Sequence, residues 1–280
     1  MCCEGTGLAC HATLRRAHAN MEALSVITLP LTMPSPLLTA FTPTDAGDFP
    51  IERLSEDALL LHVGHGIDAD TNARVHRLMA GLLAAQLPDV VELAPAYASL
   101  LVRLTPDRAF TSDSFESWLE GLRILLRQID HAKVDRFEYP SLRVPVCYGG
   151  EYGPDLEAVA AQAKLSTAEV IARHVAGDYR VAMLGFAPGF TYLLGLDPQL
   201  HVPRRADPRT RVPAGSVAIG GAQTGIYPSE LPGGWNLIGR TPLRLFDPLR
   251  DPPCLAAAGQ AVRFEVIDAA TFAQMESSTR

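Results

Sequence analysis

One segment decides the fold class of the C-terminal half: residues 211–228 read Arg211-Val-Pro-Ala-Gly-Ser-Val-Ala-Ile-Gly-Gly-Ala-Gln-Thr-Gly-Ile-Tyr-Pro228. Its two short apolar runs, Ser216–Gly220 and Thr224–Tyr227, flank a turn of small residues, which is the pattern of a tight β-hairpin. Residues 185–259 share this texture, because they hold 11 of the 22 glycines and 11 of the 22 prolines. Many short strands between Gly/Pro turns predict a β-sandwich or a β-barrel.

Further strands are expected on both sides of this segment. They are Val181–Leu184, Trp235–Ile238, Leu243–Phe246 and Val262–Ile267. Residues 149–178 predict a helical connector with two short helices, and the capping box Ser166-x-x-Glu169 opens the second of them. So many Gly and Pro positions indicate shaped loops around a cleft.

In the N-terminal half, strand-like and helix-like patterns alternate. Strands are predicted over residues 58–63, 90–94, 99–104 and 141–147, with one helix before Pro88 and another from the capping residue Asp113. The order β-α-β-β-α-β is that of the ferredoxin-like motif. We therefore expect an α+β protein with these parts: a ferredoxin-like domain over 51–148, the connector over 149–178, the β-barrel over 179–270 and a tail over 271–280.

Residues 1–50 are expected to be a disordered extension or an over-long start, with Met21 or Met33 as the true initiator. The alternative is a signal peptide, because Arg15 and Arg16 precede a short apolar run. Pro30 interrupts that run, which argues against a signal.

The composition excludes several classes of protein. A net charge of −7 over 280 residues disfavours nucleic-acid and anionic-membrane binders, which need an extended basic surface. No apolar stretch approaches the ~18 residues of a membrane span. Five cysteines without a C-x-x-C pair indicate neither a disulfide framework nor a zinc site, so a cytoplasmic location is expected.

The strongest candidate binding feature is an arginine cluster made of Arg204, Arg205, Arg209 and Arg211. Residues 201–250 hold seven arginines against three acidic residues, a local charge of +4 in an acidic chain. Guanidinium groups match carboxylate and phosphate oxygens two at a time, so the cluster predicts an anionic ligand. The alternative is a solvated loop with internal ion pairs, for instance to Asp207.

Polar residues beside this cluster are expected to complete a binding cleft. Gln223 and Thr224 follow the glycine turn 220–221, Tyr227 ends the hairpin, and Asn236 follows the Gly-Gly-Trp string. Backbone N–H groups of the glycine turn could meet an oxyanion, but a simple hairpin is the alternative. No Gly-Lys-Ser/Thr follows, so this turn is not a P-loop.

Four aromatic residues predict a surface for a protein partner. Phe186, Phe190 and Tyr192 lie on or beside a Gly/Pro loop, and Trp235 lies on the turn before a strand. Internal packing of these rings is the alternative interpretation.

Lysine and histidine usage removes other kinds of chemistry. No lysine occurs from residue 185 onward, and neither Lys133 nor Lys164 stands in a biotin-attachment motif. His201 is the only histidine in that half, so a Ser-His-Asp triad within it is not expected. The missing biotin-attachment lysine excludes a complete biotin-dependent carboxylase such as a urea carboxylase.

Three strings carry a family resemblance: residues 179–196 (Tyr179-Arg-Val-Ala-Met-Leu-Gly-Phe-Ala-Pro-Gly-Phe), 203–228, and 233–248 (Gly233-Gly-Trp-Asn-Leu-Ile-Gly-Arg-Thr-Pro). They resemble the family that unites KipI, allophanate hydrolase subunit 1 and the B-type subunit of 5-oxoprolinase, a carboxyltransferase-type family of subdomain C/D. The resemblance covers about residues 57–268. It implies that the ferredoxin-like domain is joined to a barrel of cyclophilin-like type.

The resemblance also implies a heteromeric enzyme that is inactive as this chain alone. Similarity to the B-type subunit of 5-oxoprolinase implies ATP-dependent opening of 5-oxo-L-proline to L-glutamate, with a homologous C-type (KipA-type) subunit and a LamB/YcsF-type third subunit. ATP would be used by the assembled complex. Similarity to KipI implies instead an inhibitor of a sensor histidine kinase, and similarity to allophanate hydrolase subunit 1 implies a component of a urea-linked pathway.

Overall fold

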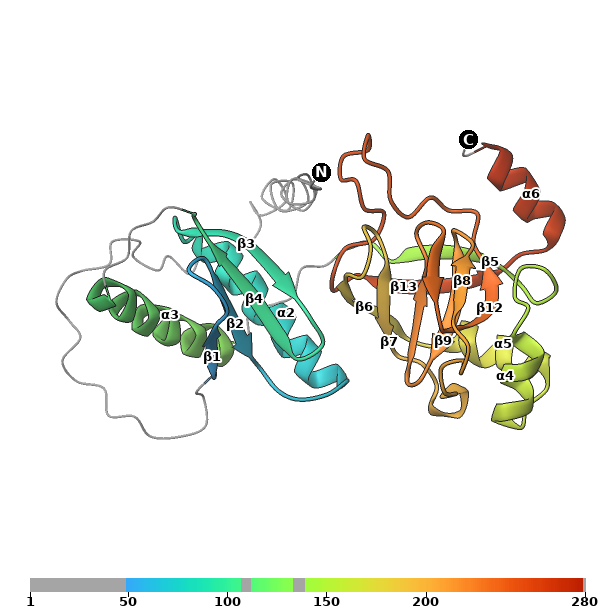
Figure 1. The fold of residues 1–280 in the computed structure, drawn as a ribbon, viewed down its shortest axis with the longest axis horizontal. Coiled ribbons are helices and arrows are strands. Elements are labelled where there is room, and N and C mark those ends of the chain that lie inside the picture. The colour runs from blue at the N-terminus through green and yellow to red at the C-terminus, as the bar shows by residue number, and fades with distance from the viewer. Residues whose placement is uncertain (1–48, 107–111, 133–138, 279–280) are drawn as a thin grey trace. The chain divides into compact units, whose positions relative to one another are not determined.

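The computed structural model describes residues 49–106, 112–132 and 139–278 (Figure 1). The expectations for residues 1–48 lie outside this described part. The chain divides near residue 137 into an N-terminal and a C-terminal unit. Each unit has its own buried apolar cluster.

The N-terminal unit is one layer of antiparallel sheet covered by one layer of helices. Its elements are β1 (Ile51–Arg53), β2 (Ala58–His62), α2 (Ala69–Ala85), β3 (Val90–Pro95), β4 (Ser99–Leu104) and α3 (Ser112–Ala132). The sheet order is β1-β2-β4-β3. Alternate residues of β2 and β4, such as Leu59 and Val102, are buried together with the apolar faces of both helices, so the helices cover the same face of the sheet.

The structure corrects the predicted membership of one strand. β5 (Leu142–Tyr148), expected to complete the ferredoxin-like sheet, belongs to the C-terminal unit. There it pairs with β12 (Asn236–Arg240) and β13 (Ala261–Val266). In the N-terminal sheet β1 takes the edge position beside β2. The physical reason is burial, because Val144, Pro145, Val146 and Cys147 are buried in succession, as in a strand that is covered on both faces. The boundary expected at residue 148 therefore comes one strand too late.

The C-terminal unit is a closed barrel of seven strands, of the cyclophilin-like type. Its other strands are β6 (Tyr179–Leu184), β7 (Thr191–Leu194), β9 (Ser216–Gly220), β10 (Gln223–Ile226), β12 (Asn236–Arg240) and β13 (Ala261–Val266). They close in the order β10-β7-β6-β13-β5-β12-β9. The strands β8 (Arg209–Val212) and β11 (Leu231–Gly233) form a separate antiparallel pair.

The barrel confirms most of the predicted strands, with two kinds of difference. Residues 243–246 are not a strand, since only an isolated bridge joins Phe246 to Cys254. The sequence prediction also missed β7, β8 and β11, which have three or four residues each. Strands this short carry too few alternating positions to be recognised by periodicity.

The segment 211–228 forms the expected hairpin. Gly220 pairs with Gln223, which leaves a turn of two residues between β9 and β10. Gly221 adopts φ +66°, a conformation that glycine enters without strain, and its N–H donates to the Val202 carbonyl at 2.8 Å. At Gly220 a Cβ atom would lie 2.6 Å from Cδ1 of Trp235, so the indole needs a glycine there.

In the described part of the C-terminal unit, three helices and one 3₁₀ turn accompany the barrel, and the helices are labelled in Figure 1. They are α4 (Leu156–Ala163), α5 (Thr167–Ala176), the 3₁₀ turn η2 (Pro198–Leu200) and α6 (Ala269–Ser278). Leu156, Val159 and Val170 from α4 and α5 are buried in the same cluster as the barrel strands. The predicted capping box of α5 is confirmed by reciprocal Ser166–Glu169 hydrogen bonds. Within the described ranges no helix is long and apolar enough to cross a membrane.

Candidate functional site

A buried carboxylate organises the arginine-rich loop. Asp155 stands just before α4, is 5% exposed, and accepts the Leu237 N–H at 2.8 Å. It also accepts two hydrogen bonds from Arg209, at 2.7 and 2.8 Å, and one from Arg205 at 2.9 Å. Burial alone would raise the pKa of Asp155. The Arg209 and Leu237 hydrogen bonds and the two positive charges outweigh it and hold that pKa below its usual value.

The four arginines predicted as one anion site therefore have different environments. Arg205 and Arg209 bind Asp155, and Arg211 pairs with Glu230 at 2.7 Å on an exposed surface. Arg204 lies over the Trp235 ring, 5.7 Å from its centroid. The alternative of internal ion pairs thus describes three of the four. Their acceptors are Asp155 and Glu230, and Asp207 offers Arg205 only a backbone carbonyl.

Mutation should separate the buried pair from the exposed one. We expect Arg209→Ala to lower the free energy of unfolding by about 2–3 kcal/mol, because Asp155 loses two charge-assisted hydrogen bonds in a buried place. We expect Arg211→Ala to cost less than about 1 kcal/mol, since its pair with Glu230 is exposed. Urea unfolding of both variants measures the difference, and equal costs would contradict it.

Thr224 lies inside the barrel and ends a chain of buried hydrogen bonds. Its hydroxyl donates to the Ala218 carbonyl at 2.9 Å, so it accepts from Nε2 of His174 at 3.1 Å. The other ring nitrogen, Nδ1, accepts from the Tyr148 hydroxyl at 2.8 Å. This network assigns the proton of neutral His174 to Nε2. Burial lowers the pKa of His174 to about 3, so the imidazole is uncharged near neutral pH.

The other polar residues predicted for the cleft are also buried. Asn236 donates to the carbonyls of Pro203 and Ile219, at 2.9 and 3.2 Å, and so ties the start of the arginine-rich loop to the barrel. Gln223 and Tyr227 are 8% and 2% exposed. Hence the structure places these residues within the barrel wall and does not gather them on an open surface. Ligand binding by the predicted set stays a prediction.

All four predicted interface aromatics are in contact with one another through Phe190. Phe190 and Trp235 are buried, and the Phe190 ring lies 4.7 Å from Tyr192 and 5.8 Å from Trp235. The Phe186 ring lies 5.4 Å from that of Phe190, yet 62% of the Phe186 surface is exposed. It has φ +68°, and the Ala187 N–H donates to the Gly185 carbonyl across it at 2.8 Å, which is a strained γ-turn.

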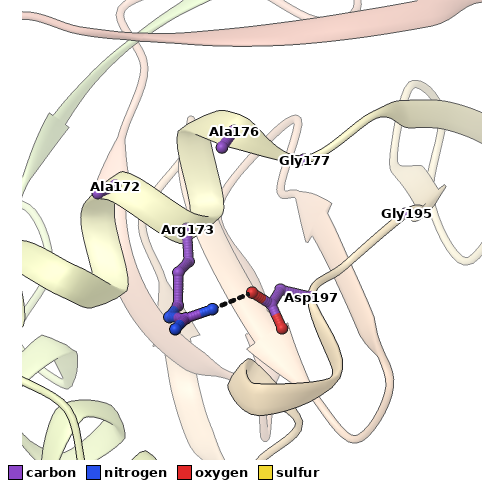
Figure 2. Close-up of a pocket in the computed structure, with 6 residues that line it drawn as sticks. All are labelled: Ala172, Arg173, Ala176, Gly177, Gly195 and Asp197. Carbon is purple, nitrogen blue, oxygen red and sulfur yellow. Dashed lines mark hydrogen bonds and ion pairs between the residues drawn. The ribbon is translucent and has the colours of Figure 1, made fainter.

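A pocket of about 400 Å³ lies between α5 and the segment that follows β7 (Figure 2). Its charged wall is Arg173, whose guanidinium donates to Asp197 at 2.8 Å. The Gln199 N–H and Arg173 hold the pKa of Asp197 below its usual value. The two charges cancel, so this pocket favours neither anions nor cations.

A second pocket, of about 270 Å³, lies at the end of β12. It is lined by Ala214, Gly215, Pro228, Arg240, Thr241, Pro242, Leu243, Arg244 and Glu276. The predicted site residues are absent from it. Its two arginines contributed to the local charge of +4 in the sequence, but that count does not tell which arginines are paired internally.

The matching family model is the carboxyltransferase domain, subdomain C and D, over residues 49–256. The chain belongs to this family. It is 42% identical over 223 residues to the B-type subunit of 5-oxoprolinase from Bacillus subtilis (strain 168), covering 77% of this chain and 92% of that protein. It is 43% identical over 211 residues to the B-type subunit of 5-oxoprolinase from Escherichia coli O157:H7, covering 75% and 93%.

Two solved structures of larger chains contain a part that is similar to this carboxyltransferase-family chain. The structure of TTHA0988 is 37% identical with a TM-score of 0.64, and the match covers 76% of this chain and 40% of that one. The Kluyveromyces lactis urea carboxylase has a TM-score of 0.64 at 17% identity, covering 90% and 24%. At that identity the likeness shows the fold alone. Asp155, His174 and Arg240 lie within the family match, whereas α6 lies beyond it.

Proposed function

We propose that this chain is the B-type subunit of an ATP-dependent 5-oxoprolinase that converts 5-oxo-L-proline to L-glutamate. One observation carries the proposal: two proteins named as this subunit of 5-oxoprolinase are 42% and 43% identical to this chain over more than nine-tenths of their length. The partners proposed are a homologous C-type subunit and a LamB/YcsF-type third subunit. The assembled complex, not this chain alone, is the proposed enzyme.

The proposed reaction consumes one ATP and two waters for each lactam opened. The lactam oxygen attacks the γ-phosphorus and ADP leaves. Water then adds to the activated carbon, the ring C–N bond breaks, and a second water releases phosphate to leave L-glutamate. This chain contains no Gly-Lys-Ser or Gly-Lys-Thr string, so its residues do not form a P-loop for the nucleotide. We therefore assign no phosphoryl-transfer step to this chain.

Reconstitution tests the proposal. The chain is co-expressed with its cognate C-type and LamB/YcsF-type subunits, and ADP and L-glutamate are measured with and without 5-oxo-L-proline. We expect both products to appear in equal amounts only when all three subunits and 5-oxo-L-proline are present. A complex that assembles fully but makes no L-glutamate would refute the proposal.

Phe186 should contribute to assembly more than to folding. An exposed bulky residue at φ +68° is strained, and such strain gathers at functional positions. Phe186→Asn removes the ring while asparagine tolerates this backbone conformation. We expect the stability of the isolated chain to change by less than about 1 kcal/mol and the affinity for the C-type subunit to fall about tenfold or more.

Titration of the labelled chain with the C-type subunit measures this loss. The matched control is Leu249→Asn, because Leu249 is also apolar and 94% exposed but belongs to a different loop. Equal affinities of the Phe186 variant and the wild type would show that the loop does not contact this partner.

A further inference from the structure

The second pocket holds a guanidinium group that is fixed in place and paired with a carboxylate only at long range. Arg240 donates from Nε to the Ala214 carbonyl at 2.8 Å, and its guanidinium lies 5.7 Å from the centroid of the Phe272 ring. Within the described residues its Nη groups make no hydrogen bond. The nearest carboxylate oxygen is that of Glu276, at 3.9 Å. Arg240 thus differs from Arg205 and Arg209, which both donate from their Nη groups to Asp155.

The remaining walls of the pocket set the size and polarity of a ligand. The walls contributed by Pro228, Pro242 and Leu243 are apolar. Arg244 is the second arginine of the lining, and it forms an ion pair with Asp247 at 3.2 Å. A volume of about 270 Å³ lies just below the usual range for ligand pockets, roughly 300–1,000 Å³. The pocket therefore fits a small molecule with one anionic group and a compact apolar body.

We propose that this pocket binds a small carboxylic acid, with its carboxylate on Arg240 and its apolar body against Pro228, Pro242 and Leu243. The planar guanidinium presents two parallel N–H donors, and a carboxylate presents two matching oxygens. Naming the acid rests on the proposed function, under which it is 5-oxo-L-proline. Its five-membered ring is the compact body, and its carboxylate is the group that Arg240 holds.

The Glu276 carboxylate competes with the ligand carboxylate for the guanidinium group of Arg240. It lies on α6, which is attached through the buried Phe272, whose ring is 4.6 Å from that of Tyr152. A separation of 3.9 Å from Arg240 allows charge attraction but is too long for a hydrogen bond. A ligand carboxylate in direct contact with Arg240 displaces this weaker internal pair. The helix lies outside the family match, which ends at residue 256.

Calorimetric titration of the full-length chain tests the pocket with four compounds. They are 5-oxo-L-proline, L-proline, 2-pyrrolidone, which has the lactam ring without a carboxylate, and inorganic phosphate. We expect the two ring carboxylates to bind, and 2-pyrrolidone and phosphate to bind at least about tenfold more weakly, because each lacks either the charge or the apolar body. Equal binding of 2-pyrrolidone or of phosphate would overturn the assignment, and so would no binding of 5-oxo-L-proline.

Two variants and two charge-matched controls locate the binding. Arg240→Gln should weaken 5-oxo-L-proline binding at least about tenfold, and Glu276→Gln should strengthen it about two- to fivefold. The controls are Arg143→Gln and Glu265→Gln, which break a surface ion pair elsewhere on the barrel and should leave the affinity unchanged. Unchanged binding in a folded Arg240→Gln chain overturns the proposal. If that variant does not fold, unchanged binding by Glu276→Gln overturns it.

The assembled complex separates this inference from the proposed function. Arg240-dependent binding of 5-oxo-L-proline with no turnover by the wild-type complex would refute the proposed function and leave the pocket standing. An Arg240→Gln complex with the wild-type KM for 5-oxo-L-proline would refute the pocket and leave the function standing.

Discussion

Replacing Asp155 with alanine is expected to lower the free energy of unfolding of the C-terminal unit by about 3–5 kcal/mol, the usual cost of removing one partner from a buried ion pair. The change leaves the guanidinium groups of Arg205 and Arg209 and the N–H of Leu237 without their common acceptor. Domains have a total stability of only about 5–15 kcal/mol, so a large share is lost. Without the Asp155 carboxylate, the arginine-rich loop should also lose its fixed position.

Urea unfolding measures this loss when the signal comes from the barrel alone. The chain has two tryptophans, and in a Trp118→Phe background the fluorescence reports Trp235, which lies in the C-terminal unit beside Arg204. Glu230→Ala is the matched control, because it removes the acceptor of the exposed Arg211 and should cost less than about 1 kcal/mol. An Asp155→Ala chain as stable as this control would show that the buried pair does not support the fold.

Acidification from pH 8 to pH 5 is expected to cost the barrel about 2 kcal/mol through His174 alone. The pKa of His174 is about 3 in the folded chain and 6.5 in the unfolded chain, so only the unfolded chain takes up a proton over this range. The stabilisation is fully present above pH 6.5 and is lost as the pH falls towards 3. At pH 5, which is 1.5 pH units below the unfolded-state pKa of 6.5, the lost stabilisation is about 1.36 kcal/mol for each of these units.

His174→Gln isolates this contribution, because glutamine keeps polar atoms in the chain between Tyr148 and Thr224 but does not titrate. Unfolding free energies are measured at pH 8, 6.5 and 5 for both proteins in the Trp118→Phe background. We expect the wild type to lose about 2 kcal/mol more than the variant between pH 8 and pH 5. Carboxylates affect both proteins alike and cancel in this difference. Parallel pH profiles would place the folded-state pKa of His174 near its ordinary value.

The features that the sequence predicted correctly depend on residues close together in the chain. The β9–β10 hairpin needs only a turn of small residues between two apolar runs, and the start of α5 needs only Ser166 and Glu169. The membership of β5 could not be found in this way. Its parallel partner β13 lies more than a hundred residues later, so a strand pattern at 142–148 says nothing of which sheet it joins.

The candidate site shows the same division. Residue counts revealed that residues 201–250 are cationic, and two of the three strings that resemble the family lie in the same region. They did not reveal which guanidinium groups are neutralised, because Asp155 lies 50 and 54 residues from Arg205 and Arg209. Nor did they reveal that Phe190 and Trp235 face each other in the interior.

By itself the sequence determined the α+β class, the barrel of short strands, the family and the cationic character of the second half. These depend on local turn chemistry, on periodicity and on composition. Only the tertiary structure decided that Asp155 pairs with both Arg205 and Arg209, and that Arg240 lines a pocket beside Glu276. The reason is physical: whether a charge is available to a ligand depends on the distance to the nearest opposite charge and on burial. Folding of the chain sets this distance and this burial, because it brings together residues that are far apart in sequence.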